Sequence, residues 1–294
     1  MTWSGGAFGE RARCVLAPNA SVMTLDGTNT WVLREPDSSR SVVVDPGPSI
    51  MSHLDEVESA AGDVATVLLT HHHADHAEAA REFAERVGCG VRALDPAYRL
   101  GSEGLNEGDV VSVDGLEIRV VATPGHSSDS LSFVLPAEGA CLTGDTVLGR
   151  GTTVVAHPDG QLGAYLDSLD RLHALASEHE ITTIWPGHGP VIDEALPVLD
   201  YYRAHRRERL EQVEAAVAQL RDAPHPNAAR VFLNFLLSEA GQTLLAAEGF
   251  RPAVSGYESK APPEVAPLLA GKLLGTTTPG RLDEMTKLAT EIYK

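Results

Sequence analysis

T-H-H-H-A-D-H-A-E-A, residues 70–79, contains four histidines and one aspartate within the six positions from His71 to His76. The segment follows the apolar, β-branched run ATVLLT at 65–70 and precedes a helical pattern with an apolar face. We therefore expect the histidines to lie in a turn between a strand and a helix that begins near Ala77. In α/β folds, the turns at the carboxyl ends of strands are where ligands commonly bind.

Three other strand-like runs end in the same kind of residue. His126 follows a run that ends in T-P-G, Asp145 follows A-C-L-T-G, and His188 follows T-I-W-P-G. A single loop histidine is ordinarily a surface residue or a hydrogen-bonded polar group. Several such residues at the ends of neighbouring strands indicate a metal site instead, and imidazole with carboxylate suits Zn²⁺, although Fe or Mn would suit the same ligands.

Short β-type runs alternate with helical patterns along most of the chain. Five residues from Ala77 to Val87 share one helical face, as do five from Leu162 to Leu172, and a long helix is expected from Glu194 to Leu220. This mixture predicts an α+β fold in which helices cover the outer faces of the sheets. The expected strands lie at 29–35, 41–47, 65–70, 118–125, 131–136, 140–145 and 182–189.

The composition is that of a globular protein, with 43% hydrophobic and 22% charged residues. No apolar stretch is long enough to cross a bilayer, so we expect no membrane partner. The first thirty residues lack the pattern of a signal peptide, which predicts a cytoplasmic location. Cys14, Cys89 and Cys141 lie far apart in the sequence, and we expect reduced, packed thiols.

The negative charge is confined to the first three quarters of the chain. The net charge is −18, from 23 Lys+Arg and 41 Asp+Glu; residues 224–294 hold seven of each kind, so residues 1–223 carry the whole imbalance. An acidic catalytic part repels phosphate backbones, which disfavours nucleic acid as a partner. The basic run from Arg203 to Arg209 is the exception, and its acidic neighbours favour a solvated helix face.

Five motifs in a fixed order carry a family resemblance. With M-T-L-D-G-T-N-T at 23–30 and A-H-R-R-E-R at 204–209, they resemble the metallo-β-lactamase-fold hydrolase superfamily over residues 15–220. The similarity is greatest to its glyoxalase-II-like and β-lactamase-like branch, which includes endoribonucleases. The five motifs are V-V-D-P-G (43–47), T-H-H-H-A-D-H (70–76), T-P-G-H-S-S-D-S (123–130), L-T-G-D-T (142–146) and P-G-H-G-P (186–190).

This resemblance implies an αββα sandwich with two metal ions, expected to be Zn²⁺, at one edge. Position by position, it implies that one metal is held by His71, His73 and His126, the second by Asp75, His76 and His188, and that Asp145 bridges them. His72 would point away. Asp45 resembles an aspartate that fixes the tautomer of a ligand histidine, although its place before Pro46 and Gly47 is equally typical of a turn. Asp129 is expected to cap its own loop.

The implied chemistry is hydrolysis by a hydroxide that bridges two metals, with Asp75 both binding metal and orienting the hydroxide. A small ester or thioester is the favoured substrate because the catalytic part is acidic. A single-stranded RNA endonuclease or phosphodiesterase uses the same kind of site and is the first alternative. A metal-binding scaffold without activity is the second, and the complete ligand set disfavours it.

The C-terminal region departs from this family. We expect a catalytic domain at 1–222 and a helical appendage at 223–294 in place of the winged-helix domain usual in the endoribonuclease subgroup. Residues 224–252 resemble the C-terminal end of the extracellular solute-binding proteins of ABC transporters. A natural fusion that caps the catalytic domain, a junction of unrelated parts and a coincidental helix pair all fit this segment, and the change of charge near Pro224 favours the junction.

Overall fold

The computed structural model describes residues 3–156 and 158–221. The chain divides into two compact units, Met1–Glu208 and Arg209–Lys294, and of the second unit only the end of one helix is described. The expected appendage at 223–294 lies outside the described residues, so its helical character and the boundary after residue 222 stay predictions. Within the described part of the chain, no helix is long and apolar enough to cross a membrane.

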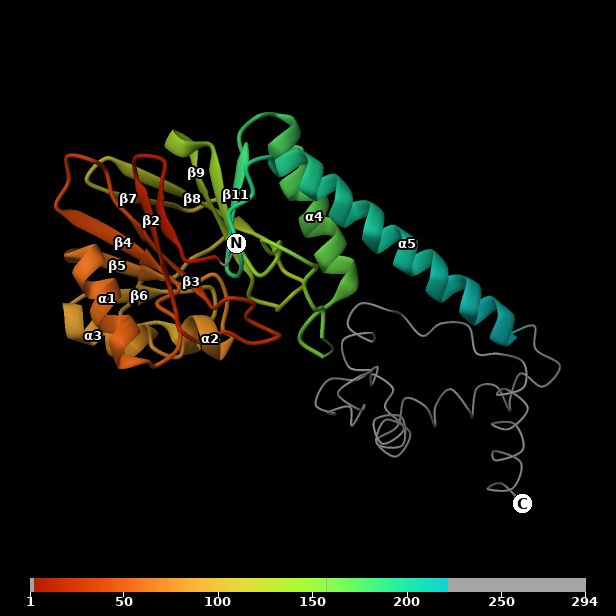
Figure 1. Ribbon diagram of the computed structural model, residues 1–294, viewed down its shortest axis with the longest axis horizontal. Coiled ribbons are helices and arrows are strands. Elements are labelled where there is room, and N and C mark those ends of the chain that lie inside the picture. Colours follow the sequence, from red (N-terminus) through yellow and green to blue (C-terminus); the bar gives the residue numbers. More distant parts are fainter. Residues whose placement is uncertain (1–2, 157, 222–294) are drawn as a thin grey trace, which may run out of the picture. The chain divides into compact units, whose positions relative to one another are not determined.

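The first unit contains two mixed sheets (Figure 1). The first sheet has six strands in chain order, and its fourth, fifth and sixth strands are parallel. Its strands are β1 (Gly6–Phe8), β2 (Ala12–Leu16), β3 (Asn29–Leu33), β4 (Arg40–Val44), β5 (Asp63–Leu68) and β6 (Gly90–Arg92). The second sheet has the order β11-β10-β9-β8-β7, with β7 (Val110–Val113), β8 (Leu116–Ala122), β9 (Leu131–Leu135), β10 (Ala140–Gly144) and β11 (Thr183–Pro186).

The two sheets face each other across an apolar core. Trp31 from β3 stacks on Trp185 from β11 with ring centroids 5.0 Å apart, and Leu33, Leu116 and Phe133 are buried between the sheets. Each large apolar side chain buried in this way stabilises the fold by about 1.5–3 kcal/mol. Strands β3, β9 and β10 are buried at every residue, because their outer faces are also covered.

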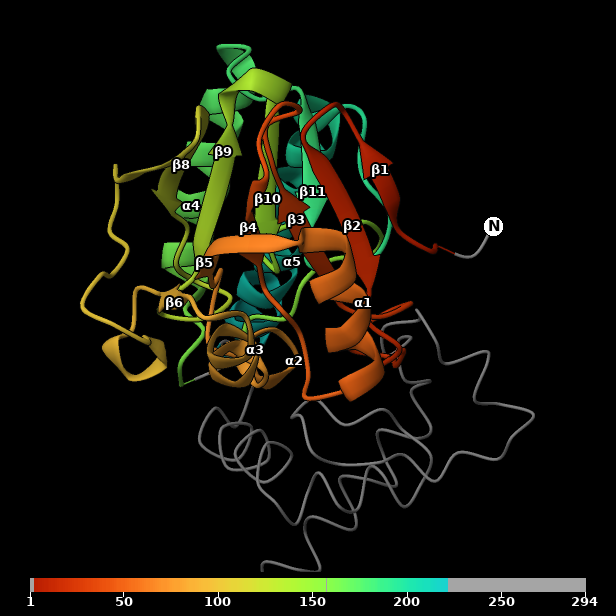
Figure 2. The ribbon, with the colours of Figure 1, turned by 90° about the vertical axis from the view of Figure 1, so that its left-hand side faces the viewer.

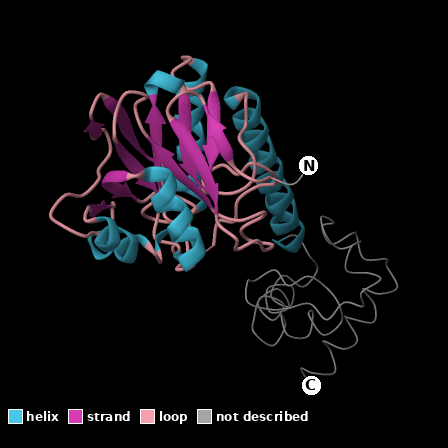
Figure 3. Ribbon diagram, turned by 60° about the vertical axis from the view of Figure 1, so that its left-hand side comes forward, coloured by secondary structure: helices cyan, strands magenta, loops and turns pink. Residues whose placement is uncertain are grey.

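Helices cover the outer faces, which gives the expected αββα order (Figures 1 and 3). Val57 and Phe83 pack on the first sheet, and Tyr165 and Leu199 pack on the second. The α+β sandwich expected from the sequence is confirmed. The helices are α1 (Met51–Ala61), α2 (Ala74–Ala77), α3 (Ala80–Val87), α4 (Leu162–Ser177) and α5 (Ala195–Arg221), with short 3₁₀ turns at Pro96–Tyr98 and Pro136–Glu138.

The carboxyl ends of several strands meet at one edge of the sandwich. Strands β4 and β5 are parallel, β10 and β11 are parallel, and β8 and β10 are both antiparallel to the β9 strand between them. The two sheets are joined at this edge, where the Leu131 N–H donates to the Thr70 carbonyl at 2.7 Å. In Figure 2 the face of the molecule that carries α1 is toward the viewer, with strands of both sheets behind it. Residues that directly follow these strands are therefore brought together.

Candidate metal centre

The histidine-rich turn leads from β5 into α2, a helix of one turn. The expected start near Ala77 is wrong, because the helix begins at Ala74 and the apolar helical pattern is split between α2 and α3. Gly47 causes the split: its N–H donates to the His76 carbonyl and its own carbonyl accepts from the Ala79 N–H, both at 3.1 Å. The D-P-G turn after β4 thus fixes the end of α2 and the position of His76.

Three imidazoles form the first group of candidate ligands. His71 follows β5, His73 precedes α2, and His126 lies in the loop after β8. His73 Nδ1 lies 3.0 Å from His71 Nε2 and 2.9 Å from His126 Nε2. His71 and His126 are buried, whereas His73 is partly open to solvent. One ring nitrogen from each residue therefore points at a common centre.

Two imidazoles and a carboxylate form the second group. His76 Nε2 and His188 Nε2 are 3.2 Å apart, and Asp75 Oδ2 lies 3.0 Å from His188 Nε2 and 3.6 Å from His76 Nε2. Both imidazoles are fully buried, while the Asp75 side chain is 29% exposed. Asp75 is therefore placed between the buried imidazoles and the solvent.

Asp145 lies between the two groups. Its Oδ1 is 3.4 Å from His76 Nε2, and its Oδ2 is 3.3 Å from His188 Nε2 and 3.7 Å from His126 Nε2. Oδ1 is buried and has no hydrogen-bond partner among the described residues. A buried carboxylate oxygen without a partner is costly, so this atom fits a bound cation.

Asp45 lies behind His76 and fixes its tautomer. The His76 Nδ1–H donates to Asp45 Oδ2 at 2.8 Å, which leaves Nε2 with a free lone pair facing the centre. Asp45 also accepts from the Thr70 N–H at 2.8 Å and the Thr70 hydroxyl at 2.6 Å. Because the hydroxyl proton of Thr70 is donated to Asp45, Thr70 Oγ1 acts as an acceptor for His71 Nδ1, which lies at 3.0 Å. One aspartate thus orients an imidazole from each group.

Backbone carbonyls orient the other two buried imidazoles, those of His126 and His188. The His126 Nδ1–H donates to the Val154 carbonyl at 2.7 Å, and the His188 Nδ1–H donates to the Gly27 carbonyl at 3.1 Å. In each ring the nitrogen that faces the centre therefore carries no proton in the neutral form. The sequence holds no signal for these partners, because any residue type supplies a carbonyl.

The donor set fits metal ions by its spacing and its lone pairs. Three inward contacts join pairs of ring nitrogens at 2.9–3.2 Å, and bare nitrogens repel at such distances unless a proton or cation lies between them. Nitrogens that share a tetrahedral Zn²⁺ with bonds of about 2.0–2.1 Å lie about 3.3 Å apart. Each group therefore has nearly the spacing of ligands around one ion.

The electrostatics differ between the two groups of candidate ligands. Burial, with the charge of neighbouring His76, lowers the pKa of His71 well below its ordinary value, so this ring is neutral. Burial opposes a charge on His188 as well, but Asp145 and Asp75 outweigh it and raise the pKa of His188 to about 9. A cation held at the second group would take the place of the proton that this raised pKa favours on His188.

Gly187 leaves room for this arrangement. A Cβ at this position would lie 2.5 Å from Asp145 Oδ1 and 2.7 Å from His76 Cε1. Both distances are shorter than a Cβ atom normally makes with a non-bonded atom. The backbone of the turn therefore packs directly against two candidate ligands. This is a physical reason for a glycine before His188.

His72 lies outside both groups. Its Nδ1 is 2.7 Å from Asp129 Oδ1, and its Nε2 is 3.9 Å from Asp159 Oδ2. Asp129 also accepts from the Ser127 hydroxyl at 2.8 Å, the capping role expected for it. His72, His73 and Asp159 could together hold a cation, but they are more open than the other groups.

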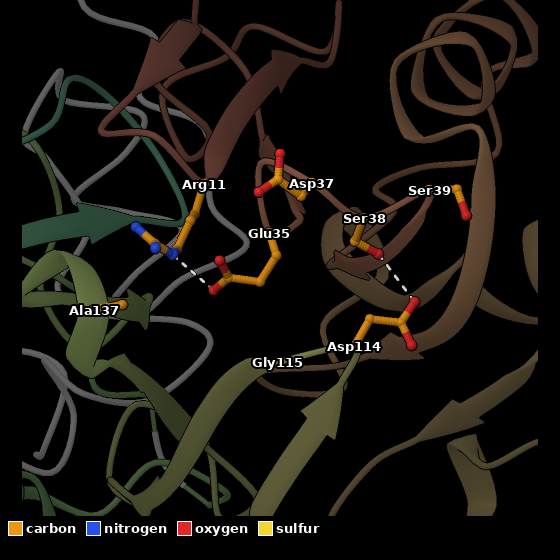
Figure 4. Close-up of a pocket in the computed structure, with 8 residues that line it drawn as sticks. All are labelled: Arg11, Glu35, Asp37, Ser38, Ser39, Asp114, Gly115 and Ala137. Atoms are coloured by element: carbon orange, nitrogen blue, oxygen red, sulfur yellow. Dashed lines mark hydrogen bonds and ion pairs between the residues drawn. The ribbon is translucent and has the colours of Figure 1, made fainter.

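A polar hollow of about 710 Å³ opens elsewhere on the first unit (Figure 4). It is lined by charged residues that pair with one another: Arg11 Nε donates to Glu35 at 2.7 Å, and the Ser38 hydroxyl donates to Asp114 at 3.0 Å. None of the candidate ligands lines this hollow. Its size alone does not make it the functional site, because the chemistry lies at the strand ends.

Two arginines of the basic run on α5 serve the fold. Arg203 pairs with Asp170 on α4, with Nε 2.6 Å from Oδ1. Arg206 lies over the Tyr165 ring, 4.9 Å from its centroid, and donates to the Thr153 carbonyl. These two cations are therefore engaged within the first unit, which weakens the run as a site for a polyanion.

Comparisons with known protein families give two matches. The model of the metallo-beta-lactamase superfamily matches residues 23–188, which include all the candidate ligands. A model of bacterial extracellular solute-binding proteins matches residues 152–251, so the resemblance expected near the C-terminus is confirmed in the sequence. The second match overlaps the first, and α4 and β11 within it belong to the sandwich.

Individual relatives cover most of the chain. The lactamase-like protein aptB of Emericella nidulans is 34% identical, over 73% of this chain and 68% of that protein. Atrochrysone carboxyl ACP thioesterase AgnL7 of Paecilomyces divaricatus is 32% identical, over 71% of this chain and 65% of that protein. A solved beta-lactamase domain protein from Burkholderia ambifaria is 25% identical with a TM-score of 0.63, over 83% of this chain and 89% of that one. The chain therefore belongs to the metallo-beta-lactamase superfamily of metal-dependent hydrolases.

Proposed function

We propose that this chain hydrolyses small ester or thioester substrates with two metal ions, expected to be Zn²⁺, held at the edge of the sandwich. His71, His73 and His126 would hold one ion, Asp75, His76 and His188 the other, and Asp145 would contact both. The observation that carries the proposal is the position of Asp145, whose two oxygens face imidazoles of both groups.

When bound, a pair of such ions supplies Lewis acidity that makes a water molecule nucleophilic near neutral pH and polarises an acyl or phosphoryl oxygen. The side chains of the chain supply orientation. Asp45, Thr70 and the two backbone carbonyls hold four of the five imidazoles, those of His71, His76, His126 and His188, in one tautomer, so little reorganisation is needed when metal binds.

Asp75 is the residue we assign to the reacting water. Its carboxylate is the more exposed member of the second group and lies beside buried His188. From this position Oδ2 faces the imidazoles, and the partly exposed carboxylate would accept a hydrogen bond from a water molecule. Asp75 would therefore both bind metal and orient the nucleophile.

The substrate class rests on the relatives and on charge. Two relatives are named as acyl carrier protein thioesterases, and each is 32% identical to this chain. A catalytic unit with an excess of acidic groups repels a polyanion, which disfavours RNA as substrate. An acyl thioester needs no such charge complementarity at its carbonyl.

The test combines metal analysis with turnover of acyl thioesters, simple esters and single-stranded RNA. We expect about two metal ions per chain and thioester hydrolysis that falls at least about 100-fold in Asp75→Ala. Asp167→Ala, at an acidic residue on the outer helix α4, is the matched control and should keep full activity. Two bound metals without hydrolysis would favour a metal-binding scaffold, and RNA cleavage lost in Asp75→Ala would favour a nuclease.

A further inference from the structure

The turn that carries His188 is held by hydrogen bonds to other parts of the chain. Pro186, Gly187, His188 and Gly189 follow β11, and Gly189 has a positive φ of 77°. Glycines lose more conformational freedom on folding than other residues, so the position of such a turn depends on external hydrogen bonds. Two of these are backbone bonds, from the Gly187 N–H to the Gly144 carbonyl at 2.8 Å and from the Gly149 N–H to the His188 carbonyl at 2.9 Å, and the His188 Nδ1–H donates to the Gly27 carbonyl.

Asn29 at the start of β3 supplies three further hydrogen bonds to this turn, on both sides of His188. Its Nδ2 donates to the Pro186 carbonyl at 2.9 Å and to the Gly189 carbonyl at 2.8 Å. Its backbone N–H donates to the Gly187 carbonyl at 2.8 Å. Asn29 is completely buried, although it belongs to no group of candidate ligands.

The orientation of the Asn29 amide follows from its partners. Trp3 Nε1, which can only donate, lies 2.7 Å from Asn29 Oδ1, and the Cys14 thiol lies 3.4 Å from the same oxygen. The two turn carbonyls can only accept, so they must face the amide nitrogen. All the donors and acceptors of this side chain are therefore used, and a rotated amide would place like groups against one another.

We propose that Asn29 is the positioning residue for His188, fixing the turn so that the imidazole reaches the second metal group. This inference rests on the proposed ligand set. Asn29 lies in the stretch at 23–30, for which the sequence indicates only the family resemblance. The proposed role gives this stretch a function. His71, His73 and His126 share no such contact with Asn29, so the effect should be confined to one metal.

The direct test is Asn29→Asp, which keeps the shape and replaces the two N–H donors by an acceptor. Metal-free protein is titrated with Zn²⁺ in competition with a chromogenic chelator, and the unmodified chain should show two binding events. In Asn29→Asp the event that is also lost in His188→Ala should weaken about 10- to 100-fold, the usual effect of removing a support behind a ligand. The other event should stay within about 3-fold.

Ser41→Ala is the matched control, because it removes a buried hydroxyl of the neighbouring strand β4 that bonds only to the Asp63 carbonyl in the described structure. Both events should be unchanged in this variant. If Asn29→Asp does not fold, Trp3→Phe decides, since it removes the Nε1–H donor that orients the amide and keeps an aromatic ring beside Phe8; a selective loss of the same event is expected. Equal weakening of both events, or no change in either, would overturn the role of Asn29. Fewer than two events in the unmodified chain would instead overturn the proposed function.

Discussion

Asp45→Asn tests how much the Asp45 carboxylate behind the imidazoles contributes to the free energy of unfolding and to metal affinity. The two oxygens of Asp45 accept three hydrogen bonds, one at Oδ1 from the Thr70 N–H and two at Oδ2 from the Thr70 hydroxyl and His76 Nδ1. An amide has only one acceptor atom, so in either orientation its NH₂ group faces at least one donor. Asp45 has a positive φ of 52°, which asparagine tolerates as well as aspartate, so the backbone is not perturbed.

The magnitude follows from these contacts. Losing a hydrogen bond to a charged acceptor costs about 1.5–3 kcal/mol, and the buried donor left behind adds about 1–3 kcal/mol. We therefore expect the metal-free variant to lose about 3 kcal/mol of unfolding free energy. For a domain of this size that lowers Tm by about 6–12 °C. Metal affinity should also fall, by about 10- to 100-fold.

The assay is denaturant unfolding of the metal-free proteins, so that metal binding does not alter the comparison. Asp114→Asn is the matched control: Asp114 also has a positive φ, 49°, but its partners Arg40 and Ser38 are on the surface. A surface ion pair contributes about 0–1 kcal/mol, so this variant should be nearly as stable as the unmodified chain. A loss below about 1 kcal/mol in Asp45→Asn would refute the reasoning, because it would mean that the buried carboxylate is replaceable.

The remaining predictions concern Gly187, metal dependence and the arginines of α5. Gly187→Ala places a methyl group 2.5 Å from Asp145 Oδ1, so the Asp145 carboxylate or the turn must shift. Because a 1 Å displacement of a site can cost about 100-fold in rate, we expect kcat for ester hydrolysis to fall about 100-fold, as measured by steady-state kinetics. Removing metal with a chelator should abolish hydrolysis and lower Tm, and added Zn²⁺ should restore both; Tm that does not change would contradict metal binding to the native state. Arg206→Ala removes a contact to the Thr153 carbonyl and an aromatic stacking partner, and urea unfolding should show a loss of about 1–2 kcal/mol. Arg203→Ala, which removes a surface ion pair, should cost less than about 1 kcal/mol, and equal losses in the two variants would contradict the packing role of Arg206.

The central strands and the edge that carries the site could be predicted from the sequence. All seven expected strands occur, because each has a run of buried apolar residues that ends in a turn signal. Strands β1, β2, β6 and β7 were missed. They are short or partly exposed, and such strands depend on pairing with their neighbours more than on their own residues.

The ligand candidates could be named from sequence because imidazole and carboxylate are chemically distinctive. The groups that support them could not, apart from Asp45. The Gly27 and Val154 carbonyls carry no side-chain signal, and Asn29 lies about 160 positions from the carbonyls that it contacts. The break between α2 and α3 was missed for the same reason, since Gly47 makes it from a distant part of the chain.

The measurement that tests the central claim most directly is a crystal structure of the Zn²⁺-loaded protein with anomalous scattering recorded at the zinc edge. We predict two anomalous peaks, one among His71, His73 and His126 and one among Asp75, His76 and His188, with Asp145 beside both. A single peak, or a peak at His72 and Asp159 in place of the second group, would contradict the proposed ligand set.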